Sequence, residues 1–268
     1  DLLLDIYLPD DGGGRTRPVV VFIHGGGFQT GSKEGKIPRT MLGYFVERGF
    51  VGMSINYRLL DDYATYPAEI NAVIDSFSGI TEKQQQQARA MYGANRDAKA
   101  AIRWIYANAA EYNIDTNHIT VIGGSAGSNI SIALGVTNPE DYRDELSLEE
   151  DPTLASTHLE YDSTVHTVID HWGGPTSVML LEETYAVDRW DGRDAPIHIV
   201  HGTNDRTVPF SQAEQIVERY EENGIPYALH PLEGAGHGAW QAEVDGKRLP
   251  ELAFDFVIQV QELPVIEH

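Results

Sequence analysis

A Gly-x-Ser-x-Gly segment directly after an apolar run is the feature that most constrains the fold of this chain. Residues 123–127 read Gly-Gly-Ser-Ala-Gly and follow the β-branched run at 119–122. Between a strand and a helix, such a segment bends so sharply that the Ser adopts a strained conformation, and the small flanking glycines allow the close packing that this requires. The segment therefore predicts a strand, a tight turn that exposes the hydroxyl of Ser125, and a helix from about residue 126.

A second glycine-rich segment follows an earlier apolar run. His-Gly-Gly-Gly-Phe occupies residues 24–28, directly after the run at 19–23. Backbone N–H groups that are free of side chains can surround an oxygen that becomes negatively charged during a reaction. We expect the amides of Gly26, Gly27 and Ala126 to form such an oxyanion hole.

A serine hydroxyl is a weak nucleophile until a histidine, oriented by a carboxylate, removes its proton. Asp205 follows the strand-like run at 197–200, and His237 lies in the glycine-flanked stretch at 234–238. We predict that Ser125, Asp205 and His237 form a catalytic triad. Other acidic and imidazole side chains compete for these roles but are placed less favourably in the sequence: Asp170, Asp188, His24, His171, His201 and His230.

With these elements in this order, the chain resembles the α/β-hydrolase carboxylesterases and lipases that have an HGGG oxyanion loop. The resemblance extends to Asp-Ile-Tyr-Leu-Pro at 5–9, Asn-Tyr-Arg-Leu at 56–59, Tyr-Pro-Ala at 66–68 and the helix around 97–104. It implies an α/β-hydrolase fold with a mostly parallel sheet of about eight strands, helices on both faces and short cap insertions. It also implies a serine esterase that forms an acyl-enzyme intermediate and needs no cofactor.

Two departures leave the esterase subclass open. Position 124 is Gly where similar esterases often carry Asp or Glu, and Ser128 stands where a further Gly is common. The alternatives are a peptidase or amidase on the same fold, or a catalytically silent binding protein of that fold. The preferred ester, whether short-chain, feruloyl, acetyl-sugar or polyester, is equally open.

The length and composition favour one catalytic domain over residues 1–268. The chain is 41% hydrophobic and contains no long charged or Gly/Ser-rich linker. Residues 60–95 and 138–166 are candidate cap or lid insertions, and the second of these is rich in acidic residues and Pro. We expect residues 138–166 to overhang the site, with a plain surface excursion as the alternative.

Alternating apolar and amphipathic segments predict the order of the elements. Strands are predicted at 2–8, 18–23, 50–56, 119–123, 167–172, 197–201 and 226–232. Helices are predicted at 37–48, 96–112, 126–135, 211–223 and 250–262. A capping-box pattern at Thr81 and Gln84 predicts a further short helix, and Asn113 is placed to end the 96–112 helix. Asp97 is read as a charge near the start of that helix, where it would complement the helix dipole.

The charge of the chain limits its partners. Acidic residues outnumber basic ones 41 to 19, for a formal net charge of −22. A surface of this sign repels phosphate backbones, so we expect an ester substrate and no nucleic acid as partner. The acidic excess is compatible with a saline habitat, in which salt screens repulsion, and equally with an ordinary soluble surface.

The sequence also bears on membrane spans, disulfides, metal binding, localisation and the substrate pocket. No run reaches the ~20 apolar residues of a membrane span, and no Cys is present to form disulfides or thiolate metal ligands. No His-Glu-x-x-His spacing occurs, so no catalytic metal is indicated. Residue 1 is Asp, not Met, so localisation in the cytoplasm or outside the cell stays open, as does the oligomeric state. Aromatic residues in loops near strand ends are candidate pocket residues: Phe28, Trp172, Tyr185, Trp190 and Trp240.

Overall fold

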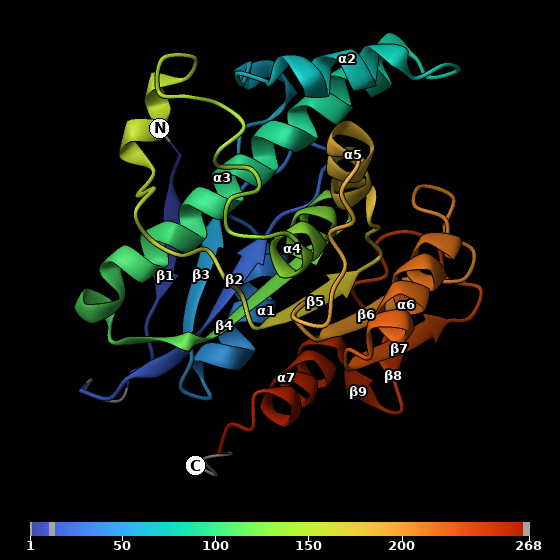
Figure 1. Cartoon of the computed structure of the whole chain (residues 1–268). Coiled ribbons are helices and arrows are strands. Elements are labelled where there is room, and N and C mark those ends of the chain that lie inside the picture. The colour runs from blue at the N-terminus through green and yellow to red at the C-terminus, as the bar shows by residue number, and fades with distance from the viewer. Residues whose placement is uncertain (1, 11–13, 265–268) are drawn as a thin grey trace.

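The computed structural model describes residues 2–10 and 14–264. At its centre is a sheet with the strand order β1-β3-β2-β4-β5-β6-β7 (Figure 1). The strands are β1 (Leu4–Tyr7), β2 (Arg17–Ile23), β3 (Val51–Ile55), β4 (Ile114–Gly124), β5 (Thr167–His171), β6 (Ile197–Gly202) and β7 (Tyr227–Leu232). β1 runs antiparallel to β3, and all other neighbours are parallel. The described residues thus form the predicted mostly parallel sheet, with seven strands in place of about eight.

Helices pack on both faces of this sheet because its inner strands are apolar on both sides. Along β2, Val19 and Val21 face one apolar cluster, whereas Val20 and Phe22 face the other. The first cluster includes residues of α2 (Ala68–Ser76), α3 (Glu82–Tyr112), α4 (Ala126–Val136), α5 (Thr176–Tyr185) and α6 (Ser211–Asn223). The second includes residues of α1 (Lys36–Val46) and α7 (Leu249–Val260). This alternation along one strand joins the two helical layers to a single sheet.

The helix α3 is longer than the sequence analysis predicts. The capping box at Thr81 and Gln84 is confirmed, but it begins the same helix that ends at Asn113, so the separate short helix is wrong. Gly93 lies inside this helix without interrupting it. A Cβ there would approach the Cβ of Ala64 to 2.7 Å, so close packing favours glycine at this position. Figure 1 shows α3 running along one face of the sheet. Asp97 therefore lies mid-helix, and its assignment to the helix start is wrong.

Residues 138–166 lie against α3 and α5 and include only a short 3-10 helix, η2 (Pro152–Ser156). The buried Lys99 of α3 donates to the carbonyl of Asn138 at 2.8 Å. The hydroxyl of Tyr142 donates to the carbonyl of Ser177 in α5 at 2.7 Å. These contacts anchor the segment to the helical layer, and its role as a lid over the site stays a prediction.

Two smaller features complete the described chain. A 3-10 turn, η1 (Leu60–Asp62), precedes α2, and a hairpin of β8 (Glu243–Val244) and β9 (Lys247–Arg248) precedes α7. Within the described ranges, no helix combines the length and apolar character that crossing a bilayer requires.

Candidate active site

Ser125 stands at the turn between β4 and α4. Its backbone has φ 57° and ψ −118°, a strained combination for a residue with a side chain. The turn is tight because a Cβ on Gly123 would lie 2.2 Å from the carbonyl carbon of Gly127, and a Cβ on Gly127 would lie 2.0 Å from the oxygen of Ile23. The glycines on both sides of Ser125 are thus required by packing, as the Gly-x-Ser-x-Gly pattern predicts.

The structure brings the three predicted triad residues together. The Oγ of Ser125 lies 2.9 Å from Nε2 of His237. The other ring nitrogen, Nδ1, lies 2.7 Å from Oδ2 of Asp205. Ser125 and Asp205 follow β4 and β6, and His237 lies beyond the end of β7. Because parallel strands end at one edge of the sheet, residues far apart in sequence meet there.

The surroundings of Asp205 favour its charged form. Oδ1 accepts the backbone N–H groups of Thr207 at 2.8 Å and Val208 at 3.0 Å. Burial alone would raise the pKa of Asp205, but the hydrogen bonds from His237, Thr207 and Val208 outweigh it and hold that pKa below its ordinary value. An ionised carboxylate here fixes the orientation of the imidazole and stabilises its protonated form.

The predicted oxyanion residues border the same turn. Gly25 packs so closely that a Cβ there would lie 3.5 Å from the Cβ of Ser125. Gly26 and Gly27 have positive φ values of 119° and 61°. Ala126 is the first residue of α4. Within residues 2–10 and 14–264, the amides of Gly26, Gly27 and Ala126 donate to no backbone carbonyl outside the regular helices and strands. Their role as an oxyanion hole stays a prediction.

Two side chains that the sequence analysis missed hold the oxyanion loop. Gln87 of α3 donates through Nε2 to the carbonyl of Gly27 at 3.1 Å. The hydroxyl of Tyr57 donates to the carbonyl of His24 at 2.8 Å, and the two rings stack with their centroids 4.2 Å apart. Tyr57 belongs to the Asn-Tyr-Arg-Leu motif, which could have indicated it, whereas no pattern marks Gln87 within its run of glutamines.

The candidate pocket aromatics separate into two groups. Trp172 lies 6.4 Å from the ring of His237 and 4.7 Å from Trp240, measured between ring centroids. Phe28 follows the oxyanion glycines and lies 6.3 Å from Tyr57. Trp190 instead packs on Tyr220 of α6 at 6.0 Å. The hydroxyl of Tyr185 is buried without a hydrogen-bond partner among the described residues. The structure thus brings Trp172 and Trp240 close to the triad, but Trp172 and Trp190 are both buried in the apolar clusters that flank the sheet.

The rival acid and base candidates have other contacts. Asp170 accepts the N–H of Gly173 at 2.7 Å. His201 lies 3.5 Å from Asp205 and 2.9 Å from the carbonyl of Val208. Neither side chain has a hydrogen bond to His237 or Ser125 among the described residues.

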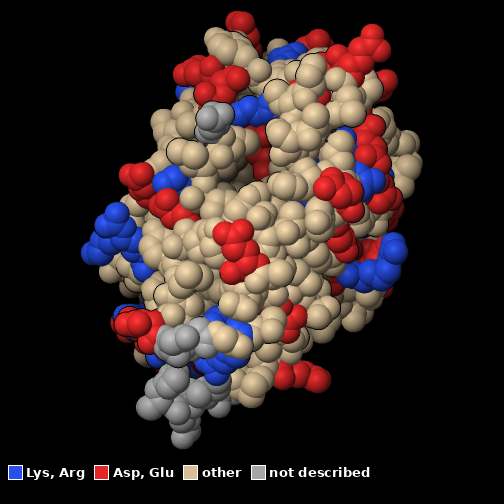
Figure 2. Space-filling view, turned by 90° about the vertical axis from the view of Figure 1, so that its left-hand side faces the viewer, with Lys and Arg blue, Asp and Glu red and all other residues tan. Residues whose placement is uncertain are grey.

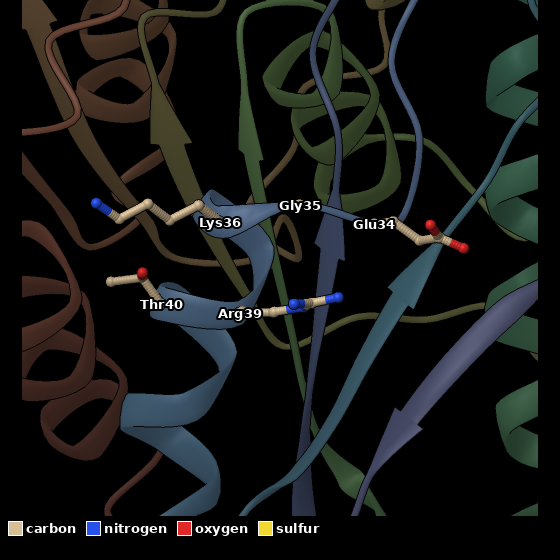
Figure 3. Close-up of a pocket in the computed structure, with 5 residues that line it drawn as sticks. All are labelled: Glu34, Gly35, Lys36, Arg39 and Thr40. Carbon is tan, nitrogen blue, oxygen red and sulfur yellow. The ribbon is translucent and has the colours of Figure 1, made fainter.

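A surface hollow at the start of α1 contains none of the predicted site residues. It has a volume of about 540 Å³ and is lined by Glu34, Gly35, Lys36, Arg39 and Thr40. Figure 3 shows that the side chains of Lys36 and Glu34 point in opposite directions, so they do not converge on one point.

The fold has counterparts among solved esterases. The thermophilic esterase Est2 of the planctomycete Thermogutta terrifontis, with propionate bound, matches with a TM-score of 0.72 and 28% identity, over 100% of this chain and 92% of that chain. The same esterase phosphorylated by paraoxon matches with a TM-score of 0.70 and 27% identity, over 97% and 89% of the two chains. The fold and the site therefore define a serine esterase domain of the α/β-hydrolase class.

Sequence comparison assigns the family within this class. A family model described as BD-FAE matches residues 4–86 and 80–192, and the dienelactone hydrolase family model matches residues 153–248. The chain belongs to the BD-FAE family.

A curated relative extends beyond the region that it shares with this chain. Esterase LipC of Mycobacterium tuberculosis is 26% identical over 261 residues, which cover 88% of this chain and 56% of LipC. The chain spans about half the length of the curated relatives that it matches first.

Proposed function

We propose that this protein hydrolyses carboxylic esters with Ser125 as nucleophile, His237 as base and acid, and Asp205 as the residue that orients the imidazole. Oγ of Ser125 attacks the acyl carbon while Nε2 of His237 takes the hydroxyl proton. The C–O bond to the alcohol then breaks, and His237 gives its proton to the leaving oxygen. Water, deprotonated by the same imidazole, attacks the acyl-enzyme and releases the acid.

The observation that carries this proposal is the pair of contacts on His237, 2.9 Å to Ser125 and 2.7 Å to Asp205. Each tetrahedral intermediate has a negatively charged oxygen, and we assign its stabilisation to the amides of Gly26, Gly27 and Ala126. Removal of one such donor typically lowers kcat by about 10²–10³-fold.

We infer that esters with short acyl groups are the substrate class. The similar Thermogutta terrifontis esterase binds propionate. In this chain, the ring of Trp172 lies 6.4 Å from that of His237 and packs on Trp240, so bulky aromatic side chains fill the space beside the catalytic histidine. Activity on para-nitrophenyl esters of increasing acyl length, beside feruloyl and acetyl-sugar esters, tests this substrate class directly.

The decisive experiment for the mechanism is the Ser125→Ala variant. We expect ester hydrolysis to fall on the order of 10⁴-fold or more with the fold intact, because the hydroxyl supplies the covalent step. Ser78→Ala, an exposed serine, is the matched control and should keep full activity. Paraoxon should label the peptide containing Ser125 in the parent and not in the variant. A Ser125→Ala protein that keeps a tenth of the activity contradicts the assignment.

A further inference from the structure

A second cavity lies at the β1 edge of the molecule and contains none of the triad residues. It has a volume of about 760 Å³, within the range of small-molecule sites, and lies between residues 2–4, α3 and residues 153–158. Figure 2 looks onto this side of the molecule and shows a hollow with acidic and basic side chains around it. The position of this cavity is separate from the turn that holds Ser125.

Three arginines line the cavity, and two of them are neutralised. Arg58 forms a two-pronged ion pair with Asp97, with contacts from 2.8 to 3.1 Å. Arg96 pairs with Asp151 at 3.0 Å. Arg103 donates through Nε to the carbonyl of Thr157 at 2.8 Å. Among the described residues, no ion pair includes Arg103, so it is the one arginine of the cavity wall without a paired carboxylate. Asp62 also lines the cavity, but its carboxylate accepts the N–H of Leu59.

The unpaired cation is also short of hydrogen-bond acceptors. Arg103 is only 1% exposed, and its Nη1 is buried without a partner among the described residues. Nε and Nη2 of Arg96 are also buried without a hydrogen-bond partner among the described residues. Burial, together with repulsion from Arg143 and Arg96, lowers the pKa of Arg103 to about 10, although Asp144 and Glu160 act against this shift. A buried guanidinium without a counterion is costly, and an anion beside it removes much of that cost.

The helix α3 presents these groups to the cavity along one stripe. Arg96, Ala100 and Arg103 are separated by four and three residues, which places them on one face about 10 Å long. Between the two arginines, the small side chain of Ala100 leaves free volume. The rest of the wall is mixed. Residues 2–4 and Trp104 are apolar, whereas residues 153–158 contribute mostly polar side chains.

We propose that this cavity binds a small carboxylic acid in its ionised form, with the carboxylate on the guanidinium of Arg103 and a short aliphatic or aromatic tail against the apolar wall. The carboxylate accepts N–H groups that no described residue uses. Its planar oxygen pair matches the guanidinium fork. The tail lies against the leucines at 2–4, which form the apolar part of the wall opposite α3.

Calorimetric titration with hexanoate, hexanol and hexylamine tests the proposal on the whole 268-residue chain. We expect hexanoate to bind at one saturable site outside the triad, and hexanol to bind roughly tenfold or more weakly because it lacks the charge. Hexylamine, which has the wrong sign of charge, should not compete. Equal affinities for the acid and the alcohol would overturn the proposal.

Two variants locate the site. Arg103→Gln should weaken hexanoate binding roughly tenfold or more. Ala100→Leu keeps every charge and fills the space between the arginines, so it should block binding even if Arg103→Gln folds poorly. The matched control is Arg193→Gln, which removes an exposed arginine paired with Asp191. Ester hydrolysis should persist in all three variants, which separates this proposal from the proposed catalytic function.

If hexanoate binds near the triad and not in this cavity, the variants should give the opposite result. In that case Arg103→Gln and Ala100→Leu keep the affinity of the parent chain for hexanoate, and Ser125→Ala or a bulky substitution near the triad changes it. That pattern, or a parent chain that binds no hexanoate, rejects the cavity as a carboxylate site.

Discussion

The ring of Trp240 occupies the space that a side chain at position 124 would need. A Cβ on Gly124 would lie 2.4 Å from Cζ2 of Trp240, and Trp240 is held in place by Trp172. Similar esterases often carry an acidic residue at this position. Gly124 therefore leaves the space that the Trp240 ring fills, and the residue that fits at one of these positions depends on the residue at the other.

We predict that Gly124→Ala destabilises the chain by about 1–3 kcal/mol, because the new methyl group forces the indole to move. In a Trp240→Ala background the same substitution should have little effect, because the obstructing ring is absent. Thermal melting of the parent, the two single variants and the double variant measures this coupling. Strictly additive changes in stability would show that the two positions are independent.

Asp205→Asn should lower kcat by about 10³–10⁴-fold, because the amide does not hold the imidazole in the tautomer that the reaction needs. Asp170→Asn is the matched control, since Asp170 is also a buried carboxylate but bonds Gly173. If Asp170→Asn loses activity and Asp205→Asn keeps it, the acid has been assigned wrongly.

Gln87→Ala should lower kcat about 5- to 30-fold and change KM much less, because its bond to Gly27 positions donors that act on the transition state. Gln86→Ala, an exposed neighbour in the same run, is the control and should leave kcat unchanged. Steady-state kinetics on one short-chain ester separate the two parameters. A rise in KM at constant kcat would indicate a role in ground-state binding instead.

The contribution of Asp194 to the stability of the chain should become less favourable as the pH rises from about 4 to 8. Burial, reinforced by the negative charge of Asp191, raises the pKa of Asp194 to about 8. The folded state therefore keeps a proton that the unfolded state has lost, so rising pH favours unfolding across this window. Asp194→Asn should melt a few degrees higher than the parent above pH 8 and similarly near pH 4. A constant difference across the whole range would rule out this titration.

If the acidic excess reflects a saline habitat, the melting temperature should rise with salt as the repulsion among acidic side chains is screened. The chain has 41 acidic and 19 basic residues, so repulsion among its acidic side chains is available for salt to screen. Thermal melting across a sodium chloride series checks it. A melting temperature that does not change with salt would indicate that the acidic excess is ordinary surface charge.

The parts of the site that could be predicted from sequence are those encoded locally. The turn at Ser125 depends on glycines within two residues, and the apolar runs before it and before Asp205 are strand signals in their own right. The order Ser125, Asp205 and His237 is that of the α/β-hydrolases that the chain resembles, and this resemblance predicted that the three residues meet. The capping box at Thr81 and the helix end at Asn113 could be predicted because both depend on residues only a few positions apart.

Tertiary structure alone decided how distant side chains share space. The contact of Gln87 with Gly27 spans 60 residues, and the contact of Trp240 with Gly124 spans more than a hundred. Close packing against Ala64 favours glycine at position 93, and the missing ion pair of Arg103 depends on which carboxylates the fold places beside Arg58 and Arg96. Periodicity and turn chemistry reach only a few residues along the chain, whereas these contacts depend on strand order and on the shapes of side chains that the sheet brings together.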